Sequence, residues 1–519
     1  MKRSEKLIRI ISPEINSPSL KDNTADADRI IRAVKKSFEK KEVNMDFSLV
    51  KEVPYKLREN DYKISLCIFD TGNKVEIIDV YPQEPLTDIY GIACDLGSTT
   101  IVMRLIRLQD QKNVDQIQFH NPQIEVGADI LTRIHFASQE DGLKKLQNMV
   151  IRRMNEEIEK LSQKHNISPN SIVGITVAGN TSMTHLFLGL TPYWICREPY
   201  IPVINRFEPL KASDVGLSIN PRAPLIVFPN VGSYFGGDLI AGILVSGMAR
   251  QEDEICMLVD VGTNAEVVLG NADWLMACAG AAGPALEGGV ASMGMMAGPG
   301  VIDKVRIDPD TLDIKYHTIG DLPPVGICGS GLIDLVAQLF ITGMIDIRGK
   351  FVPERCGNRL IEKDNIKYLI IVPAKESGTG KDLYLSQPDI DSLIRSKAAM
   401  YTILTTIINT MNLNFSDIGK FYIAGTFGLY IDPVSAITIG MIPDLPLDTY
   451  VPLGNTSIEG ATMLFSSLDY YAEMFKIRDM ITYMELNVNQ EFMQLFSAAK
   501  FIPHTDRSLF PSVKQYNEK

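Results

Sequence analysis

The sequence predicts an α/β protein in which one α/β domain is duplicated and a smaller α/β domain precedes the pair. The chain has 519 residues, which at roughly 150 residues per domain allows three or four domains. Two segments, around Asp95 and around Asp260, share the order Asp-x-Gly-Ser/Thr after an apolar run, and internal repeats of this kind indicate a repeated architecture. Residues 1–88 are richer in lysine and glutamate and poorer in glycine than the remainder. We therefore expect a small domain at 1–88, a first lobe at 89–250, and a second lobe with C-terminal helices at 251–519.

The small domain is expected to combine a helix with a β-hairpin. Residues 26–40 carry apolar side chains on one side at helical spacing. Residues 62–69 and 74–80 alternate like two strands around the turn Asp70-Thr71-Gly72-Asn73. Two prolines, Pro82 and Pro85, then mark a short linker.

Each lobe is expected to begin with its strand–turn–strand hairpin and to continue with alternating helices and strands. The hairpin strands are residues 92–94 with 101–108, and residues 257–259 with 265–269. Hydrophobic periodicity predicts further helices and strands, namely helices at 143–163, 235–248, 332–340 and 390–411 and strands at 171–178 and 421–424. A charged insertion covers residues 348–382.

Composition and charge exclude several classes of protein. The formal net charge is -12, so sequence-independent binding to nucleic acid or to an anionic membrane, which depends on cationic surface, is not expected. The N-terminus lacks the apolar stretch of a signal peptide, and residues 274–302, although apolar, are too rich in glycine for a spanning helix. The seven cysteines are widely spaced and form no CxxC, which suits a reducing cytoplasm and predicts no recognisable iron–sulfur motif.

The two hairpin turns are the strongest candidates for chemistry. Backbone N–H groups and hydroxyls in such a turn can surround a phosphate, and an aspartate at the strand end can hold a hydrated Mg²⁺. A single copy would favour the alternative that Asp and Gly only form the turn, but two similar copies favour a pair of phosphate clamps facing one another. No Walker A sequence and no GxGxxG after a first strand is present. The candidate residues are Asp95, Gly97, Ser98, Thr99 and Thr100 in the first turn and Asp260, Gly262, Thr263 and Asn264 in the second.

These motifs resemble the superfamily of acetate and sugar kinases, heat-shock chaperones and actin. The two turns look like its two phosphate motifs, and Gly425-Thr426-Phe427-Gly428 after residues 422–424 looks like its adenosine motif. Residues 233–248, with Asp238, and residues 457–466 look like its two connecting helices. The resemblance implies a duplicated ribonuclease-H-like, actin-like ATPase fold that binds Mg-ATP, with Asp95 and Asp260 around the magnesium.

A closer resemblance covers nearly the whole chain. Residues 89–93, 121–123, 127–129, 133–134, 178–181, 280–288, 329–331 and 502–504 are similar to the reductive activators of corrinoid methyltransferase systems. Members of that family use ATP to return an inactivated Co(II) corrinoid protein to Co(I). Family members usually carry an iron–sulfur domain, and no cysteine cluster for one occurs here. This departure from the family pattern leaves two accounts: the electrons come from a separate reductase or ferredoxin, or the protein only opens or binds its corrinoid partner. The DxHxxG signature of corrinoid-binding modules is also absent, so the cobalamin is expected on a partner protein.

Several further residues have two interpretations. Asp238 could orient water or bind magnesium through water, or it could be a helix N-cap. Glu287 is the one charged residue of an apolar stretch and is expected either to pair or to contact ligand. Gly329, Ser330 and Gly331, like Gly425–Gly428, are expected to approach the adenosine or close the cleft. Cys94 and Cys256 are interpreted as small hydrophobic strand residues.

The expected function is thus ATP-dependent activation of a corrinoid protein. We expect the protein to be cytoplasmic and to take part in anaerobic metabolism. Two alternatives remain open: a nucleotide-switched binding protein, and an activator of another low-potential enzyme such as a 2-hydroxyacyl-CoA dehydratase. The sequence does not determine the electron source or the oligomeric state, for which a homodimer is one candidate.

Overall fold

The computed structural model describes residues 5–38, 40–262, 264–281, 291–486 and 492–514. The chain divides into two compact units, each treated separately below. Unit 1 contains residues 1–245 and 456–479, and unit 2 contains residues 246–455 and 480–519. A late segment of the chain therefore belongs to the unit that the N-terminal half forms. The expected domain boundaries after residues 88 and 250 stay predictions.

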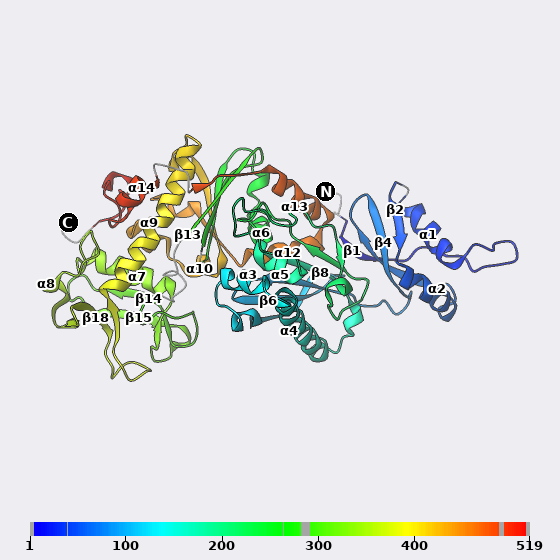
Figure 1. Ribbon diagram of the computed structural model, residues 1–519, viewed down its shortest axis with the longest axis horizontal. Coiled ribbons are helices and arrows are strands. Elements are labelled where there is room, and N and C mark those ends of the chain that lie inside the picture. The colour runs from blue at the N-terminus through cyan, green and yellow to red at the C-terminus, as the bar shows by residue number, and fades with distance from the viewer. Residues whose placement is uncertain (1–4, 39, 263, 282–290, 487–491, 515–519) are drawn as a thin grey trace. The chain divides into compact units, whose positions relative to one another are not determined.

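The N-terminal part of unit 1 is a four-stranded sheet with two helices (Figure 1). Its strand order is β1-β3-β4-β2, and the elements are β1 (Ile8–Ile11), α1 (Asp26–Ser37), β2 (Glu42–Met45), α2 (Phe47–Glu59), β3 (Ile64–Asp70) and β4 (Lys74–Pro82). Apolar residues of α1 and α2, among them Ile30 and Val53, form one core with the sheet. The expected helix and hairpin are confirmed, with the helix ending at Ser37.

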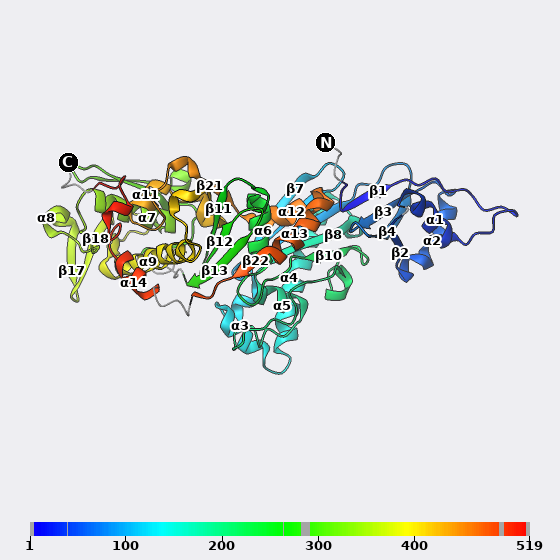
Figure 2. The ribbon, with the colours of Figure 1, turned by 90° about the horizontal axis from the view of Figure 1, so that it is seen from above.

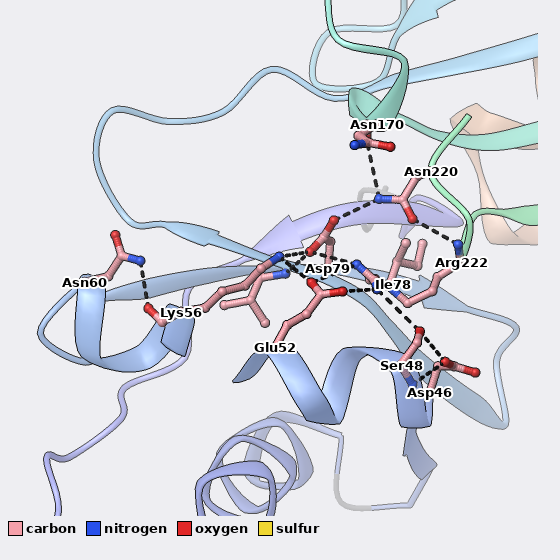
Figure 3. A network of polar contacts seen from close by, with 11 residues as sticks. Asp46, Ser48, Glu52, Lys56, Asn60, Ile78, Asp79, Asn170, Asn220 and Arg222 are labelled. Carbon is pink, nitrogen blue, oxygen red and sulfur yellow. Dashed lines mark hydrogen bonds and ion pairs between the residues drawn. The ribbon is translucent and has the colours of Figure 1, made fainter. Parts of the chain in front are cut away.

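A buried polar network joins this small sheet to the rest of unit 1 (Figure 3). Asp79 on β4 is 6% exposed; its carboxylate accepts from Lys56 and, at 2.8 Å, from Asn220 Nδ2. Arg222 lies 3.3 Å from Asp79 and donates to Glu52 at 2.8 Å and to the carbonyl of Ile78 at 2.8 Å. Because a buried carboxylate needs such partners, Arg222 and Asn220 attach the small sheet to the large one.

The large sheet of unit 1 has the order β7-β6-β5-β8-β10-β9. Its strands are β5 (Tyr90–Leu96), β6 (Thr100–Arg107), β7 (Lys112–His120), β8 (Ile172–Gly179), β9 (Leu210–Lys211) and β10 (Pro224–Val227). β5, β6 and β7 are antiparallel neighbours, whereas β8 runs parallel to β5 and β10 runs parallel to β8.

Helices cover both faces of this sheet (Figure 2). One face packs against α4 and α5, whose apolar residues share a core with β5 and β8. The other face packs against α12: the ring of Phe465 lies where a side chain at Gly91 would be, and Thr176 donates to the carbonyl of Ala461 at 2.8 Å. The helices are α3 (Ile130–Ala137), α4 (Gly142–His165), α5 (Thr181–Leu188), α6 (Gly237–Ser246), α12 (Thr456–Ser466) and α13 (Leu468–Met480).

The large sheet of unit 2 repeats this topology. Its order is β21-β20-β11-β12-β13-β22, with β11 (Ile255–Val261), β12 (Asn264–Gly270), β13 (Leu275–Ala281), β20 (Ile418–Ala424), β21 (Tyr450–Gly454) and β22 (Ile481–Tyr483). β11, β12 and β13 are antiparallel, β20 is parallel to β11, and β21 is parallel to β20. β11, β12, β13, β20 and β21 thus correspond in order and direction to β5, β6, β7, β8 and β10. The expected duplicated α/β fold is confirmed.

Unit 2 also contains two small sheets and a long helix. One sheet is β15-β14-β16 and the other is β17-β18-β19, formed by β14 (Val301–Ile307), β15 (Ile314–Thr318), β16 (Gly326–Ile327), β17 (Leu360–Lys363), β18 (Ile366–Val372) and β19 (Leu383–Ser386). α9 begins at a capping box in which Ser386 and Asp389 satisfy one another's backbone N–H groups. The helices of this unit are α7 (Gly329–Ile341), α8 (Pro353–Cys356), α9 (Gln387–Thr410), α10 (Gly425–Tyr430), α11 (Pro433–Thr438) and α14 (Phe492–Ala499). Across the described residues, every helix is too short or too polar to cross a membrane.

Candidate functional site

The candidate residues of unit 1 meet at one edge of its large sheet. Leu96 at the end of β5 faces Gly179 at the end of β8, and Val177 on β8 faces Val227 on β10. Because these three strands are parallel, their carboxyl ends lie at the same edge, where ligands of open α/β sheets bind. The turn after β5, Asn180 after β8 and the loop that leads from β10 to α6 are therefore neighbours.

The first phosphate-type turn, residues 97–99, is tightly built. A Cβ atom on Gly97 would lie 2.3 Å from the carbonyl oxygen of Thr100, so glycine is required there. Asn121 fastens the turn twice: its Nδ2 donates to the Gly97 carbonyl at 2.9 Å, and its backbone N–H donates to the Thr99 carbonyl at 2.9 Å. Thr99 is exposed, and Gly97, Ser98 and Thr100 are partly exposed. The turn is thus rigid on its inner side and accessible on its outer side.

Asp95 precedes this turn on an otherwise buried strand. Its side chain is partly exposed, whereas both neighbours, Cys94 and Leu96, are buried. Burial raises the pKa of the Cys94 thiol well above its ordinary value, so the thiol stays protonated. The interpretation of Cys94 as a small hydrophobic residue is confirmed.

Asp238 lies in the first turn of α6. Its carboxylate accepts from the backbone N–H of Leu239 at 3.0 Å, and desolvation raises its pKa to about 6. The approach of this segment to Asn180 is close: a Cβ on Gly236 would lie 2.3 Å from Asn180 Cα. A carboxyl group with a pKa near neutrality is suited to accept a proton from water. The N-cap interpretation is wrong, because Asp238 is the second residue of α6 and lies inside the helix; the role toward water or magnesium stays a prediction.

The second hairpin and the adenosine-type motif adjoin one another in unit 2. Asp260 on β11 faces Ala424 at the end of β20. Gly425 follows with φ +83°, and a Cβ there would lie 3.0 Å from Asp260 Oδ1. Residues 425–428 form the first turn of α10, and a Cβ on Gly428 would lie 2.7 Å from the Ile423 carbonyl oxygen. Both glycines permit the helix start to lie against the strand that carries Asp260.

Gly329, Ser330 and Gly331 form the buried first turn of α7 in the same unit. A Cβ on Gly331 would lie 2.5 Å from the carbonyl oxygen of Ile302, and the Cys328 sulfur lies 3.2 Å from Ser330 Oγ. Packing against β14 therefore accounts for Gly331. An additional contact of this turn with nucleotide stays a prediction.

The predicted residues fall into two sets, one in each unit. Asp95, Gly97–Thr100 and Asp238 belong to unit 1, and Asp260, Gly262, Asn264, Gly329–Gly331 and Gly425–Gly428 belong to unit 2. Thr263 and Glu287 lie outside the described residues, as do the side chains of Asn264, Thr426 and Phe427. The proposed roles of all these residues stay predictions.

Sequence reasoning assigned no role to Asn121 and Asn180, which hold the first turn. Each asparagine directly follows a strand and caps a helical segment. Asparagine is a preferred N-cap, so the sequence carries a signal for the cap. The second hydrogen bond of each side chain, to Gly97 and to Ser98 respectively, joins segments far apart in sequence.

The described residues contain no group of three or more His, Cys, Asp or Glu side chains arranged to hold a metal ion. Magnesium does not need such a group, because it keeps several waters and binds through one or two carboxylates. All seven cysteines are free thiols, and each is buried except Cys196, which is partly exposed.

Three family models match consecutive parts of the chain. They are described as the RACo linker region, over residues 4–85, the RACo middle region, over residues 90–251, and the C-terminal domain of RACo, the ASKHA domain, over residues 254–514.

Characterised proteins with similar sequences or structures agree with these matches. The chain is 32% identical over 440 residues to the corrinoid activation enzyme RamQ of Eubacterium limosum, covering 83% of this chain and 73% of that protein. It is 25% identical over 425 residues to the [Co(II) methylated amine-specific corrinoid protein] reductase of Methanosarcina barkeri, covering 76% of this chain and 73% of that protein. A solved structure described as a reductive activator for corrinoid, iron–sulfur protein superposes with a TM-score of 0.88 at 37% identity, covering 98% of this chain and 81% of that one. The chain therefore belongs to the RACo family of corrinoid activators, with an ASKHA domain as its C-terminal part.

Proposed function

We propose that this protein is an ATP-dependent reductive activator that helps return an inactivated Co(II) corrinoid protein of a methyltransferase system to Co(I). Membership of the RACo family and the printed functions of RamQ and the Methanosarcina barkeri reductase support the corrinoid part of the proposal. The observation that carries the ATP part is the turn at residues 97–99, a glycine-dependent loop held by Asn121 at the carboxyl edge of a duplicated sheet.

The residues present fit Mg-ATP. The backbone N–H groups and hydroxyls of residues 97–100 are donors for phosphate oxygens, and Asp95 and Asp260 supply carboxylate oxygens of the kind that magnesium prefers. Bound ATP supplies free energy on hydrolysis. In the proposed reaction Asp238 orients the attacking water and accepts its proton, a role that its pKa of about 6 suits.

The free energy requirement explains why an activator would use ATP. Suppose that nucleotide-bound activator binds the reducible form of the corrinoid protein ~10⁴-fold more tightly than the resting form. This preference corresponds to about 5.5 kcal/mol. For a one-electron couple it shifts the effective potential by roughly 240 mV. Conformational preference alone would therefore close a substantial part of a gap in potential.

The electron is proposed to come from a separate low-potential protein. Reduction of Co(II) to Co(I) takes one electron. Six of the seven free thiols are buried, burial raises the pKa of the Cys94, Cys256, Cys278 and Cys356 thiols, and buried thiols of this kind are inert. A reductase or ferredoxin would donate that electron directly to the bound corrinoid protein.

The test combines ATP hydrolysis with the cobalt spectrum. Purified protein is assayed for phosphate release with and without a Co(II) corrinoid protein from the same organism, and Co(I) formation is followed spectroscopically with a low-potential reductant. We expect the corrinoid protein to stimulate hydrolysis, and Co(I) to form only with ATP present. Gly97→Ala should abolish both, because its Cβ would collide with the Thr100 carbonyl. Gly298→Ala is the matched control, since its Cβ would meet nothing closer than 4.0 Å.

Two other outcomes would replace the proposal. Tight nucleotide binding without hydrolysis or stimulation would indicate a nucleotide-switched binding protein. Stimulation by a dehydratase instead of a corrinoid protein would indicate an activator of another low-potential enzyme.

A further inference from the structure

The side-chain amide of Asn180 connects the phosphate-type turn to helix α5. Its Nδ2 donates to Ser98 Oγ at 3.0 Å, and its Oδ1 accepts from the backbone N–H of Met183 at 2.9 Å. Asn180 itself follows β8 and is the N-cap of α5. One side chain therefore caps a helix and contacts the turn at the same time.

This arrangement determines the direction of the hydrogen bond to Ser98. A backbone N–H is always a donor, so the amide atom that faces Met183 must be the oxygen. The atom that faces Ser98 is then the NH₂ group, which can only donate. Ser98 Oγ must accept this hydrogen bond, and its single O–H proton is left to donate elsewhere.

The position of Asn180 is rigidly determined by its surroundings. Next to it, Thr181 Oγ1 lies 3.3 Å from the Gly232 carbonyl oxygen and 3.2 Å from that of Phe235. A Cβ on Gly236 would lie 2.3 Å from Asn180 Cα, and a Cβ on Gly179 would lie 2.9 Å from the Leu96 carbonyl oxygen. Neighbours on both sides thus leave no space for Asn180 to move away from Ser98.

We propose that Asn180 is a positioning residue that makes Ser98 a hydrogen-bond donor to a phosphate oxygen of the bound nucleotide. A phosphate oxygen is an acceptor only, so a hydroxyl helps to bind it only when its proton points outward. By occupying the acceptor side of Ser98, Asn180 sets this polarity before nucleotide arrives. The inference rests on the proposed function, in which residues 97–100 bind phosphate.

Asn180→Asp tests the polarity with little change in shape. Aspartate caps a helix as well as asparagine does, so α5 keeps its cap to Met183. The carboxylate, however, accepts from Ser98, turns the hydroxyl proton inward and adds a negative charge near the phosphates. We expect the Kd for Mg-ATP and Mg-ADP, measured by calorimetry, to rise roughly tenfold to a hundredfold, while the Kd for adenosine, which carries no phosphate, stays the same.

Two comparisons separate positioning from a general structural effect. Asn155→Asp makes the same exchange on α4, where the Asn155 amide donates to the Gly216 carbonyl and accepts from the Ser218 N–H. This variant should leave the affinities for ATP and for adenosine unchanged. In a Ser98→Ala background, Asn180→Asp should lose much of its effect, because the hydroxyl whose polarity it reverses is gone.

The outcomes are distinguishable. Equal weakening of ATP and adenosine binding, unchanged ATP binding, or an undiminished effect in the Ser98→Ala background would overturn the role of Asn180 while the proposed function stands. Failure of the unsubstituted protein to bind ATP would overturn both.

Discussion

Replacement of Asp238 by asparagine should make the protein more stable and less active. Desolvation raises the pKa of Asp238 from its ordinary value of 3.8 to about 6, so the folded state binds its proton more tightly than the unfolded chain does. Above pH 6 the carboxylate must be charged in the folded protein, and this costs free energy. Each unit of pKa corresponds to about 1.4 kcal/mol, so the full cost is roughly 3 kcal/mol.

The sign of the pH dependence follows from proton linkage. Between pH 3.8 and about 6 the folded state holds the proton and the unfolded state does not, so this group's contribution to stability falls as pH rises. The asparagine side chain of the variant cannot ionise and therefore lacks this pH-dependent contribution. The stability difference in favour of the variant should therefore be roughly 3 kcal/mol at pH 8 and about half of that at pH 5.

The assay compares the two proteins by thermal unfolding at pH 5, 6, 7 and 8, with ATP hydrolysis measured on the same samples. We expect the unfolding midpoint of Asp238→Asn to exceed that of the unsubstituted protein by an amount that grows with pH. We also expect its hydrolysis rate to fall on the order of a hundredfold or more, as for loss of a general base. A variant that is less stable at pH 8, or a stability difference that does not change with pH, would refute the desolvation argument. Unchanged hydrolysis would refute the role of Asp238 toward water.

Three further predictions concern other buried charged or titratable groups. Arg222→Met should destabilise the protein by about 2 kcal/mol in thermal unfolding, because Asp79 stays buried with fewer partners. The control Arg152→Met, which removes an exposed ion pair to Glu156, should change stability by less than about 0.5 kcal/mol. Equal effects of the two substitutions would contradict the importance of the network in Figure 3. Burial holds the pKa of Lys397 well below its ordinary value of 10.5. The stability of the unsubstituted protein relative to Lys397→Met should therefore rise between pH 7 and 10. A stability difference that does not change over this pH range would argue against a neutral Lys397 amine in the folded protein. Burial also lowers the pKa of His185, whose ring accepts from the Val203 N–H and contacts the Thr181 carbonyl. The stability of the protein should therefore fall as pH drops below about 6.5. His185→Gln should reduce that fall, which urea unfolding of both proteins at pH 5 and 7 would measure.

Local sequence patterns predicted most of the elements that build the site. The apolar strands before Asp95 and Asp260 were expected because each is a short apolar run ended by a polar turn, and they are β5 and β11. The helix expected at 143–163 is α4, which extends from Gly142 to His165. Most of its apolar residues recur at helical spacing and are buried in the core shared with the sheet, which is the condition under which periodicity is informative.

The insertion at 348–382 shows where such patterns carry less information. The sequence predicted only that this insertion is charged. It contains the helix α8 and the strands β17 and β18, and these two strands form a small sheet with β19. β17 has two exposed and two partly exposed residues, so no strong alternation between apolar and polar residues marks it. Its pairing with β18, rather than burial of its own side chains, makes it a strand.

The position of α12 is likewise a tertiary property. The superfamily resemblance implied a connecting helix at residues 457–466, and α12 confirms it. Its contacts are with β5, β6 and β8, far earlier in the chain. Arg104 on β6 binds Glu459 with hydrogen bonds of 2.7 and 3.0 Å. No local sequence pattern predicts this ion pair, because Arg104 and Glu459 are adjacent only after both segments have folded.

The sequence by itself determined the duplicated strand–turn–strand hairpins, the glycines of their turns and the family resemblance, because these depend on short-range spacing and on residue type. Only the tertiary structure decided that Asn180 donates to Ser98 and that desolvation raises the pKa of Asp238. The direction of a hydrogen bond depends on which partner the other end of the amide meets, and a pKa depends on how much water its neighbours exclude. Both are set by atoms that lie close in space and far apart along the chain.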